Sequence, residues 1–183
     1  VDAYRELGMS WEFTGLTFLE VFHVADREVL RPKDFPVLTG NRDYAHSRNG
    51  IYFASQYISP LTFKTEYSVG TGINFLPPAG QEPSLADLTR ADIGVILRPL
   101  RPLRVENTYL LERLTDRSDG ASIFNNHIIR SHWNWQFNRE FSLRVIVQYN
   151  AVLANQQRTS LETTKNVNAD FLHEALITDH ELT

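Results

Sequence analysis

Three groups of residues in this chain have types that could support chemistry. The six histidines come first, because a neutral imidazole is a common metal ligand. His127 and His132 lie five residues apart, so on one strand they point to opposite faces and cannot hold one ion together. We therefore expect the histidines to be polar strand or loop residues, and the sequence predicts no metal site and no cofactor.

A serine, a histidine and an asparagine occur close together at Ser131, His132 and Asn134, as in a membrane-embedded hydrolase. A serine nucleophile needs its base within hydrogen-bond reach. Successive strand residues point to opposite faces, so Ser131 and His132 cannot act as a pair. The sequence therefore predicts no catalytic residues and favours a role other than that of an enzyme, with a membrane-embedded hydrolase as the least favoured alternative.

Two loop segments resemble binding motifs only superficially. Residues 116–120, with two aspartates, a serine and a glycine, lack the alternating oxygens and the final glutamate of a calcium loop. Residues 70–72 read Gly-Thr-Gly, but no lysine and no helix follow them, as a phosphate-binding loop requires. We expect the first to be a polar turn and the second to be a flexible strand end.

The composition narrows the class of protein. The chain has 183 residues, a net charge of −4 and no cysteine. The near balance of acidic and basic residues argues against nucleic acid as a partner, since phosphate binding needs a basic surface. The missing cysteines exclude disulfide scaffolds and thiol chemistry. No apolar stretch is long enough for a membrane-spanning helix.

Alternation of apolar and polar residues is the strongest pattern in the chain, and it is clearest between Ser131 and Tyr149. A period of two residues is that of a β-strand with two different faces. Odd positions form an apolar, aromatic face, and even positions form a polar face in which only Ile146 is out of place. The triplet 138–140 interrupts the pattern and predicts a hairpin turn, with Phe137 opposite Phe141. Four further pairs follow from that register: Trp135 with Leu143, Trp133 with Val145, Asn134 with Arg144, and Arg130 with Gln148.

The same pattern recurs along the chain and predicts about seven strands in a domain of residues 1–172. The expected strands outside the first hairpin are 11–22, 51–57, 61–69, 89–97 and 103–111. Short turns, such as the one at Ser59-Pro60, alternate with long connections such as 25–49. This alternation is typical of a transmembrane barrel, whose turns face the periplasm and whose loops face the exterior.

Strand length and the position of aromatic residues favour a membrane. The strands have about 9–11 residues, enough to cross a bilayer when tilted, and aromatic residues gather beside the short turns as in an interfacial girdle. The sequence thus predicts an all-β antiparallel up-and-down meander, part of a transmembrane outer-membrane β-barrel in contact with outer-membrane lipid. A soluble β-sandwich, or a lipocalin-like barrel that binds a ligand, would show the same alternation and remains the alternative.

The prediction assigns residues to each face. The residues expected to face lipid are Trp133, Trp135, Phe137, Phe141, Leu143, Val145, Val147 and Tyr149. The residues expected to line the lumen are Arg90, Asp92, Arg104, Glu106, Arg130, Asn134, Arg144 and Gln148.

From about Gly50 onward the chain resembles a bacterial family. The matching segments include 59–61, 72–78, 124–127, 164–172 and, most specifically, residues 139–150 with the sequence REFSLRVIVQYN. They are similar to the C-terminal region, a domain of unknown function, of large Gram-negative envelope proteins with an N-terminal domain like a family-nine carbohydrate-binding module. The resemblance implies an outer-membrane barrel larger than this chain, with a transport or surface-anchoring role and a carbohydrate partner bound through an upstream domain. It brings no catalytic residues.

The end of the chain departs from the family pattern. Residues 173–183 lack strict alternation and a terminal aromatic residue. We expect an atypical tail there, truncated or frame-shifted, so that the chain is a fragment.

Overall fold

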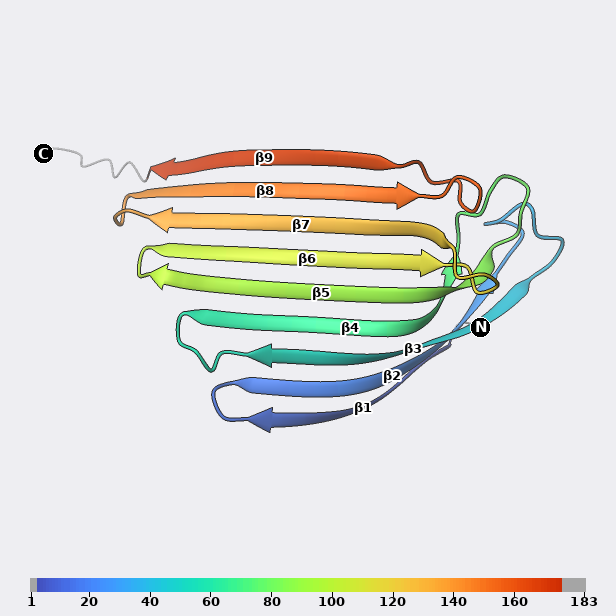
Figure 1. Cartoon of the computed structure of the whole chain (residues 1–183), viewed down its shortest axis with the longest axis horizontal. Helices are drawn as coiled ribbons and strands as arrows, with labels where there is room; N and C mark the ends of the chain where they lie inside the picture. Colours follow the sequence, from blue (N-terminus) through green and yellow to red (C-terminus); the bar gives the residue numbers. More distant parts are fainter. Residues whose placement is uncertain (1–2, 176–183) are drawn as a thin grey trace, which may run out of the picture.

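The computed structural model describes residues 3–175, with side chains described up to residue 172. These residues form a single antiparallel sheet of nine strands, arranged in the order of the sequence (Figure 1). The predicted all-β antiparallel meander is confirmed, and the described residues include no helix able to cross a membrane. The strands are β1 (Ala3–Phe13), β2 (Thr17–Leu30), β3 (Arg42–Ser55), β4 (Leu61–Asn74), β5 (Ser84–Leu100), β6 (Leu103–Thr115), β7 (Ser122–Gln136), β8 (Phe141–Ala154) and β9 (Thr164–Ala175).

The strand register gives the sheet two faces that can be read from residue parity. Odd-numbered residues pair with odd-numbered ones, and even with even, from β1 to β9. Register shifts occur only near Pro99 at the end of β5 and near Ile123 at the start of β7. Away from these two shifts, we call the face that carries the odd-numbered strand residues the outer face. The face that carries the even-numbered residues is the inner face.

The hairpin β7–β8 has the predicted register. Trp133 pairs with Val145 and Asn134 with Arg144, and the other predicted pairs are also observed. Phe137 lies in the turn against Phe141, with ring centroids 5.2 Å apart. Aromatic and β-branched cross-strand pairs of this kind stabilise a hairpin by about 0.2–1 kcal/mol each.

The prediction of one strand over residues 11–22 is wrong, because a tight turn divides that segment into β1 and β2. Gly15 and Leu16 have φ angles of 71° and 51° in this turn. A left-handed conformation is costly for a leucine, so Leu16 is not a residue from which a turn would be predicted. The expected long connection 25–49 is also wrong in extent, because β2 continues to residue 30 and β3 already begins at residue 42. With β9, these changes raise the number of strands from about seven to nine.

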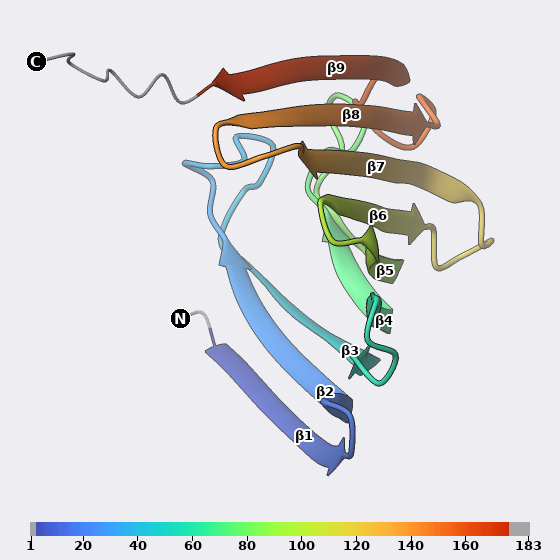
Figure 2. The same ribbon diagram turned by 90° about the vertical axis from the view of Figure 1, so that its left-hand side faces the viewer.

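The sheet is open and strongly curved (Figure 2). β1 and β9 are its two edge strands, and each pairs with only one neighbour. Closely approaching backbones accompany the curvature: a Cβ atom on Gly70 would lie 2.0 Å from the carbonyl oxygen of Ser47. The strand glycines all occupy even positions, on the inner and more crowded face of the bend: Gly8, Gly50, Gly70, Gly72 and Gly94.

The four long connections pack together at one end of the sheet. Segment 155–163 reaches segment 75–83, where the Thr159 hydroxyl and the Ser160 amide donate to the Leu76 carbonyl at 2.7 and 2.9 Å. Phe35 of segment 31–41 stacks on Phe75, with centroids 6.3 Å apart. Segment 155–163 can reach segment 75–83, which lies two hairpins away, because the sheet bends. Together the loops form a cap over the end of the inner face.

Buried apolar side chains gather beneath this cap. One cluster comprises Ala86, Leu88, Leu114 and Ile123, and a second comprises Leu30, Leu38 and Ile73. Most of the sheet, by contrast, has no second protein layer over either face, since the described residues form one sheet. Many large apolar residues outside the cap therefore remain exposed on the outer face.

Candidate functional site

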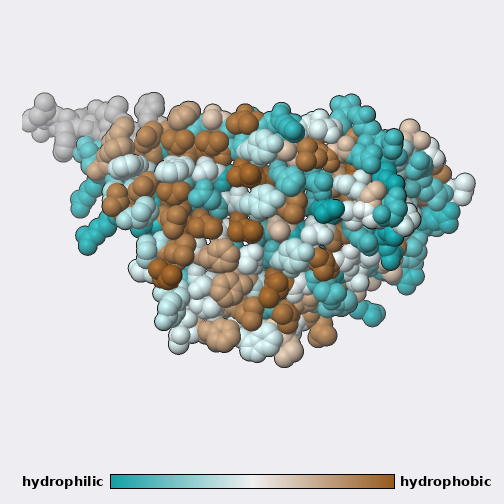
Figure 3. Space-filling model, viewed as in Figure 1, coloured by the Kyte–Doolittle hydropathy of each residue, from teal (hydrophilic) through white to brown (hydrophobic). Residues whose placement is uncertain are grey.

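Away from the long loops, the outer face is a mostly apolar surface that extends over all nine strands, and its charged residues, such as the paired Arg27 and Asp43, lie toward the loop end. Trp133 and Trp135 of β7 are 48% and 39% exposed, and Trp11 of β1, at the far side of the sheet, is 40% exposed. Hydrophobic residues spread across the strands in Figure 3, and hydrophilic residues concentrate at the end that carries the long loops. An exposed apolar area of this extent is typical of a surface that contacts another protein, a ligand or a membrane.

The polar side chains within this surface bind one another. Ser131 donates to the Asn107 side-chain oxygen at 2.7 Å and accepts from the Trp133 indole nitrogen at 2.8 Å. The Tyr109 hydroxyl shares a 2.9 Å hydrogen bond with Nδ1 of His127. The polar atoms of the outer face are thus partly satisfied without solvent.

The inner face carries charges of both signs in short networks. Arg90 of β5 pairs with Glu112 of β6 at 2.9 Å, and Arg130 of β7 donates to Gln148 of β8 at 2.8 and 2.6 Å. Arg104 pairs with Glu106. Facing charges of opposite sign are typical of a hydrated wall, where each ion pair adds little free energy.

The residues predicted for each face lie together in the structure. All eight residues expected to line a lumen occupy the inner face: Arg90, Asp92, Arg104, Glu106, Arg130, Asn134, Arg144 and Gln148. Of the eight expected to face lipid, Phe137 lies in the β7–β8 turn and the others occupy the outer face: Trp133, Trp135, Phe141, Leu143, Val145, Val147 and Tyr149. Whether these faces contact lumen and lipid stays a prediction.

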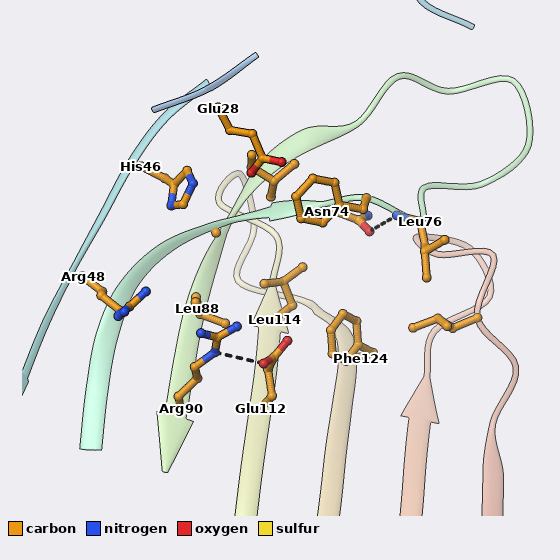
Figure 4. A pocket seen from close by; sticks show the side chains of 14 residues that line it. Glu28, His46, Arg48, Asn74, Leu76, Leu88, Arg90, Glu112, Leu114 and Phe124 are labelled. Carbon is orange, nitrogen blue, oxygen red and sulfur yellow. Dashed lines mark hydrogen bonds and ion pairs between the residues drawn. The ribbon is translucent and has the colours of Figure 1, made fainter. Parts of the chain in front are cut away.

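A cavity of about 290 Å³ lies on the inner face beneath the loop cap (Figure 4). The apolar part of its wall includes Leu88, Leu114 and Phe124, and its polar part includes Glu28, His46, Arg48, Asn74, Arg90 and Glu112. Arg48 lies 3.7 Å from Asp26, which also lies 3.8 Å from His46. The positive and negative groups nearly balance, so the cavity has no strong preference for either sign of ligand.

The residues considered for catalysis are not brought together. Ser131 lies on the outer face in the network with Asn107, and His132 lies on the inner face, 3.8 Å from Glu106. Segment 116–121 forms a turn. Its residues Asp116 and Asp119 pair with Arg158 of segment 155–163 at 2.6 and 2.5 Å. Over residues 3–172 no three histidine or acidic side chains are grouped as metal ligands, and His180 lies outside the described residues.

The Asp116 carboxylate has a perturbed acidity. The Ser118 side chain and amide donate to it at 2.6 and 2.8 Å, and Arg158 lies beside it. These hydrogen bonds, chiefly that of the Ser118 hydroxyl, hold the pKa of Asp116 below its usual value. The turn is therefore stabilised by the charged form of the aspartate.

Comparisons of the chain with protein-family models, with curated proteins and with solved structures find no match.

Sequence reasoning missed the polar residues that β2 and β3 bring to the inner face. Asp26, His46 and Arg48 lie in a segment expected to be a long connection. A signal was present, since Tyr44, His46, Arg48 and Tyr52 are all polar or amphipathic residues at even positions. The intervening odd positions are not apolar enough to reveal the strand.

Proposed function

We propose that this chain forms part of an outer-membrane β-barrel, with the outer face in lipid and the inner face along an aqueous lumen. The observation that carries the proposal is the mostly apolar part of the outer face between the short turns and the charged loop end, which no other protein layer covers within the described residues. In water such a surface would be an aggregation hazard, whereas in a bilayer it is the surface that solvation by acyl chains requires.

The height of the apolar surface fits a membrane. On β8, outer-face residues remain apolar or aromatic from Phe141 to Ala151. Ten residue steps span about 34 Å along a strand, and a strand tilt of about 40° reduces this to about 26 Å across the membrane, close to the apolar band of known barrels. The internal hydrogen bonds of Ser131 and Tyr109 also suit a medium that offers no water.

The arrangement of connections gives the proposal a direction. The short turns 14–16, 56–60, 101–102 and 137–140 lie at one end of the sheet, and the long loops lie at the other. In outer-membrane barrels the short turns face the periplasm, so we assign the short-turn end to that side. The loop cap would then lie at the cell surface.

A barrel built on this sheet needs further strands. β1 and β9 both run toward the short-turn end, because eight antiparallel steps separate them. Direct closure would pair them in parallel, whereas bacterial barrels close antiparallel with an even number of strands. The proposed barrel therefore contains an odd number of additional strands between β9 and β1.

The alternatives have less support. A β-sandwich needs a second sheet over Trp133 and Val145, and the described residues form one sheet. A lipocalin-like protein needs an apolar inner face, whereas Arg90, Glu112 and Arg130 occupy it. The more specific role, transport or surface anchoring linked to carbohydrate, rests on the family resemblance of residues 139–150 and its neighbouring segments.

Cysteine labelling tests the proposal directly, since the chain has no cysteine of its own. Single-cysteine variants at Arg144, Val145, Val147 and Gln148 are folded into phospholipid vesicles or micelles and exposed to a charged, water-soluble thiol reagent. We expect labelling of R144C and Q148C and protection of V145C and V147C, because neighbouring positions face different media.

Two controls make the result decisive. Denaturant should expose all four cysteines, and omission of lipid and detergent should leave the chain without its native β-sheet circular dichroism. Equal labelling of the two faces, or a stable folded monomer in plain buffer with V145C protected, would replace the barrel by a soluble protein.

A further inference from the structure

A shallow apolar groove lies on the outer face at the short-turn end of β6, β7 and β8. Its volume is about 220 Å³, and its wall consists of Leu103, Trp133, Trp135, Leu143, Val145 and Val147. These six residues lie on three adjacent strands, so the groove runs between the two indoles and the aliphatic side chains of β8. The groove has the dimensions and the lining of a site for a hydrocarbon chain rather than for a polar ligand.

The two turns beside the groove supply positive charge. Turns 101–102 and 137–140 lie next to each other, since the Gln136 amide donates to the Pro102 carbonyl at 2.8 Å. Arg101 and Arg139 are exposed in these turns, and neither has a hydrogen bond or ion pair through its side chain among residues 3–172. On the inner face, by contrast, Arg90 and Arg104 are paired with glutamates.

Within the four short turns themselves, charged residues occur only in the two turns beside the groove. The charged residues of the four short turns are Arg101, Arg139 and Glu140, and turns 14–16 and 56–60 are neutral. Between the groove and Arg139 lies an aromatic stack, in which Phe137 packs on Trp135 with ring centroids 5.4 Å apart. Aromatic residues of this kind prefer the depth of the lipid headgroups.

We propose that this groove binds one anionic phospholipid, with an acyl chain along Trp133 and Trp135 and the phosphate between Arg101 and Arg139. The proposal rests on the membrane placement of the outer face given above. The site is inferred because Arg101 and Arg139, which have no ion-pair partner among the described residues, lie in the turns next to the apolar groove, at the proposed level of the lipid headgroups. Guanidinium groups bind phosphate oxygens through two hydrogen bonds, and the short-turn end would meet the phospholipid leaflet on the periplasmic side.

The expected preference for an anionic headgroup is modest. One basic side chain near an anionic bilayer surface favours contact by about fivefold. Two arginines that are partly offset by Glu140 therefore give an expected local enrichment of about fivefold. The preference should weaken at high salt, because exposed charges are screened.

Tryptophan fluorescence provides the test, because the chain has only three tryptophans. The variant W11F reports on Trp133 and Trp135 alone, and the double variant W133F/W135F reports on Trp11, which lies on β1 beside the neutral turn 14–16. Each is folded into phosphatidylcholine vesicles that contain a minor fraction of lipid with brominated acyl chains. The brominated lipid is either phosphatidylglycerol or phosphatidylcholine.

We expect brominated phosphatidylglycerol to quench the W11F variant more strongly than brominated phosphatidylcholine does, and to lose that advantage in 1 M salt. The added substitutions R101Q/R139Q should abolish the difference while both lipids still quench. The Trp11 reporter should respond equally to the two lipids. Circular dichroism of each variant confirms that the sheet has formed.

The other outcomes separate the two proposals. Equal quenching of W11F by the two lipids, an equal preference at Trp11, or a preference that survives R101Q/R139Q would overturn the phospholipid site and leave the membrane placement standing. A folded protein in which neither lipid quenches any tryptophan would overturn the membrane placement and the site together.

Discussion

Ser131 of β7 donates a 2.7 Å hydrogen bond to the side-chain oxygen of Asn107 on β6, in the middle of the apolar outer face. The Trp133 indole donates to the same hydroxyl at 2.8 Å. A polar group without a partner is costly in hydrocarbon. Three polar side chains can therefore occupy this surface because each hydrogen bond between them replaces one with water.

Replacement of Ser131 by alanine should destabilise the folded protein in micelles by about 1–3 kcal/mol, since it leaves Asn107 and Trp133 without their partner. Ser142→Ala on the inner face is the matched control, with an expected change within about 0.5 kcal/mol. Urea unfolding followed by circular dichroism measures both. Equal losses for the two variants would contradict the proposed burial of the Ser131 site in lipid.

Val145 and Arg144 are neighbours on β8 that point to opposite faces. Val145→Arg should cost about 2–4 kcal/mol, because in the proposed barrel it places a charge on a lipid-facing site near mid-depth. Arg144→Gln should change the free energy of unfolding by less than about 0.5 kcal/mol, because the side chain stays on a polar face. Refolding yields and urea titrations in micelles measure the difference, and similar tolerance at both positions would reverse or abolish the assignment of faces.

The β7–β8 hairpin was predictable because aromatic residues, β-branched residues and a polar triplet all indicate the same register. The alternation from Ser131 to Tyr149, with a three-residue turn at 138–140, predicts a pairing that places the apolar residues of both strands on one face, and the structure has that pairing. The boundary between β1 and β2 was not predictable, because Leu16 adopts a positive φ that leucine rarely shows. The pairing of Phe13 with Thr17 leaves only residues 14–16 for the turn between the two strands.

The candidate site was predictable only as two faces. Parity assigns Arg90 and Arg130 to one side of the sheet and Trp133 to the other from local pattern alone. The cavity beneath the loop cap depends on contacts that no local pattern encodes. One of them is the 3.1 Å hydrogen bond from the Asn74 side-chain amide to the backbone carbonyl of Arg158, 84 residues away. The groove of the outer face likewise needs the register of three strands at once.

Gly70 marks the sharpest approach of β3 to β4. A Cβ atom there would lie 2.0 Å from the Ser47 carbonyl oxygen, so Gly70→Ala must move the backbone and should cost about 1–3 kcal/mol. Gly40→Ala is the matched control, because no atom lies within 4 Å of the added Cβ and its φ is not positive. Urea titration of both variants measures the difference, and equal stability would show that the bend at Gly70 does not require close packing.

The loop cap should loosen in acid. The Asp116 carboxyl has a pKa below its usual value of 3.8, chiefly because the Ser118 hydroxyl donates to the charged form, with Arg158 as a further partner. A lowered pKa in the folded chain means that the stabilisation is complete well above pH 3.8 and is lost as the pH falls through the lowered value. Because the site is partly exposed, the contribution is at most about 1 kcal/mol.

Hydrogen exchange of the loop amides, corrected for the intrinsic effect of pH, measures this change. The amides of Asn155 and Ser160 should lose protection below the usual pKa of an aspartate, since Arg158 holds their segment against Asp116. Asp116→Asn should show reduced protection at neutral pH and no further loss in acid. Asp34→Asn, in a loop where that side chain has no ion pair among the described residues, should keep the acid transition. An unchanged transition in Asp116→Asn would assign the loosening to another carboxylate of the cap, such as Asp119, which also pairs with Arg158.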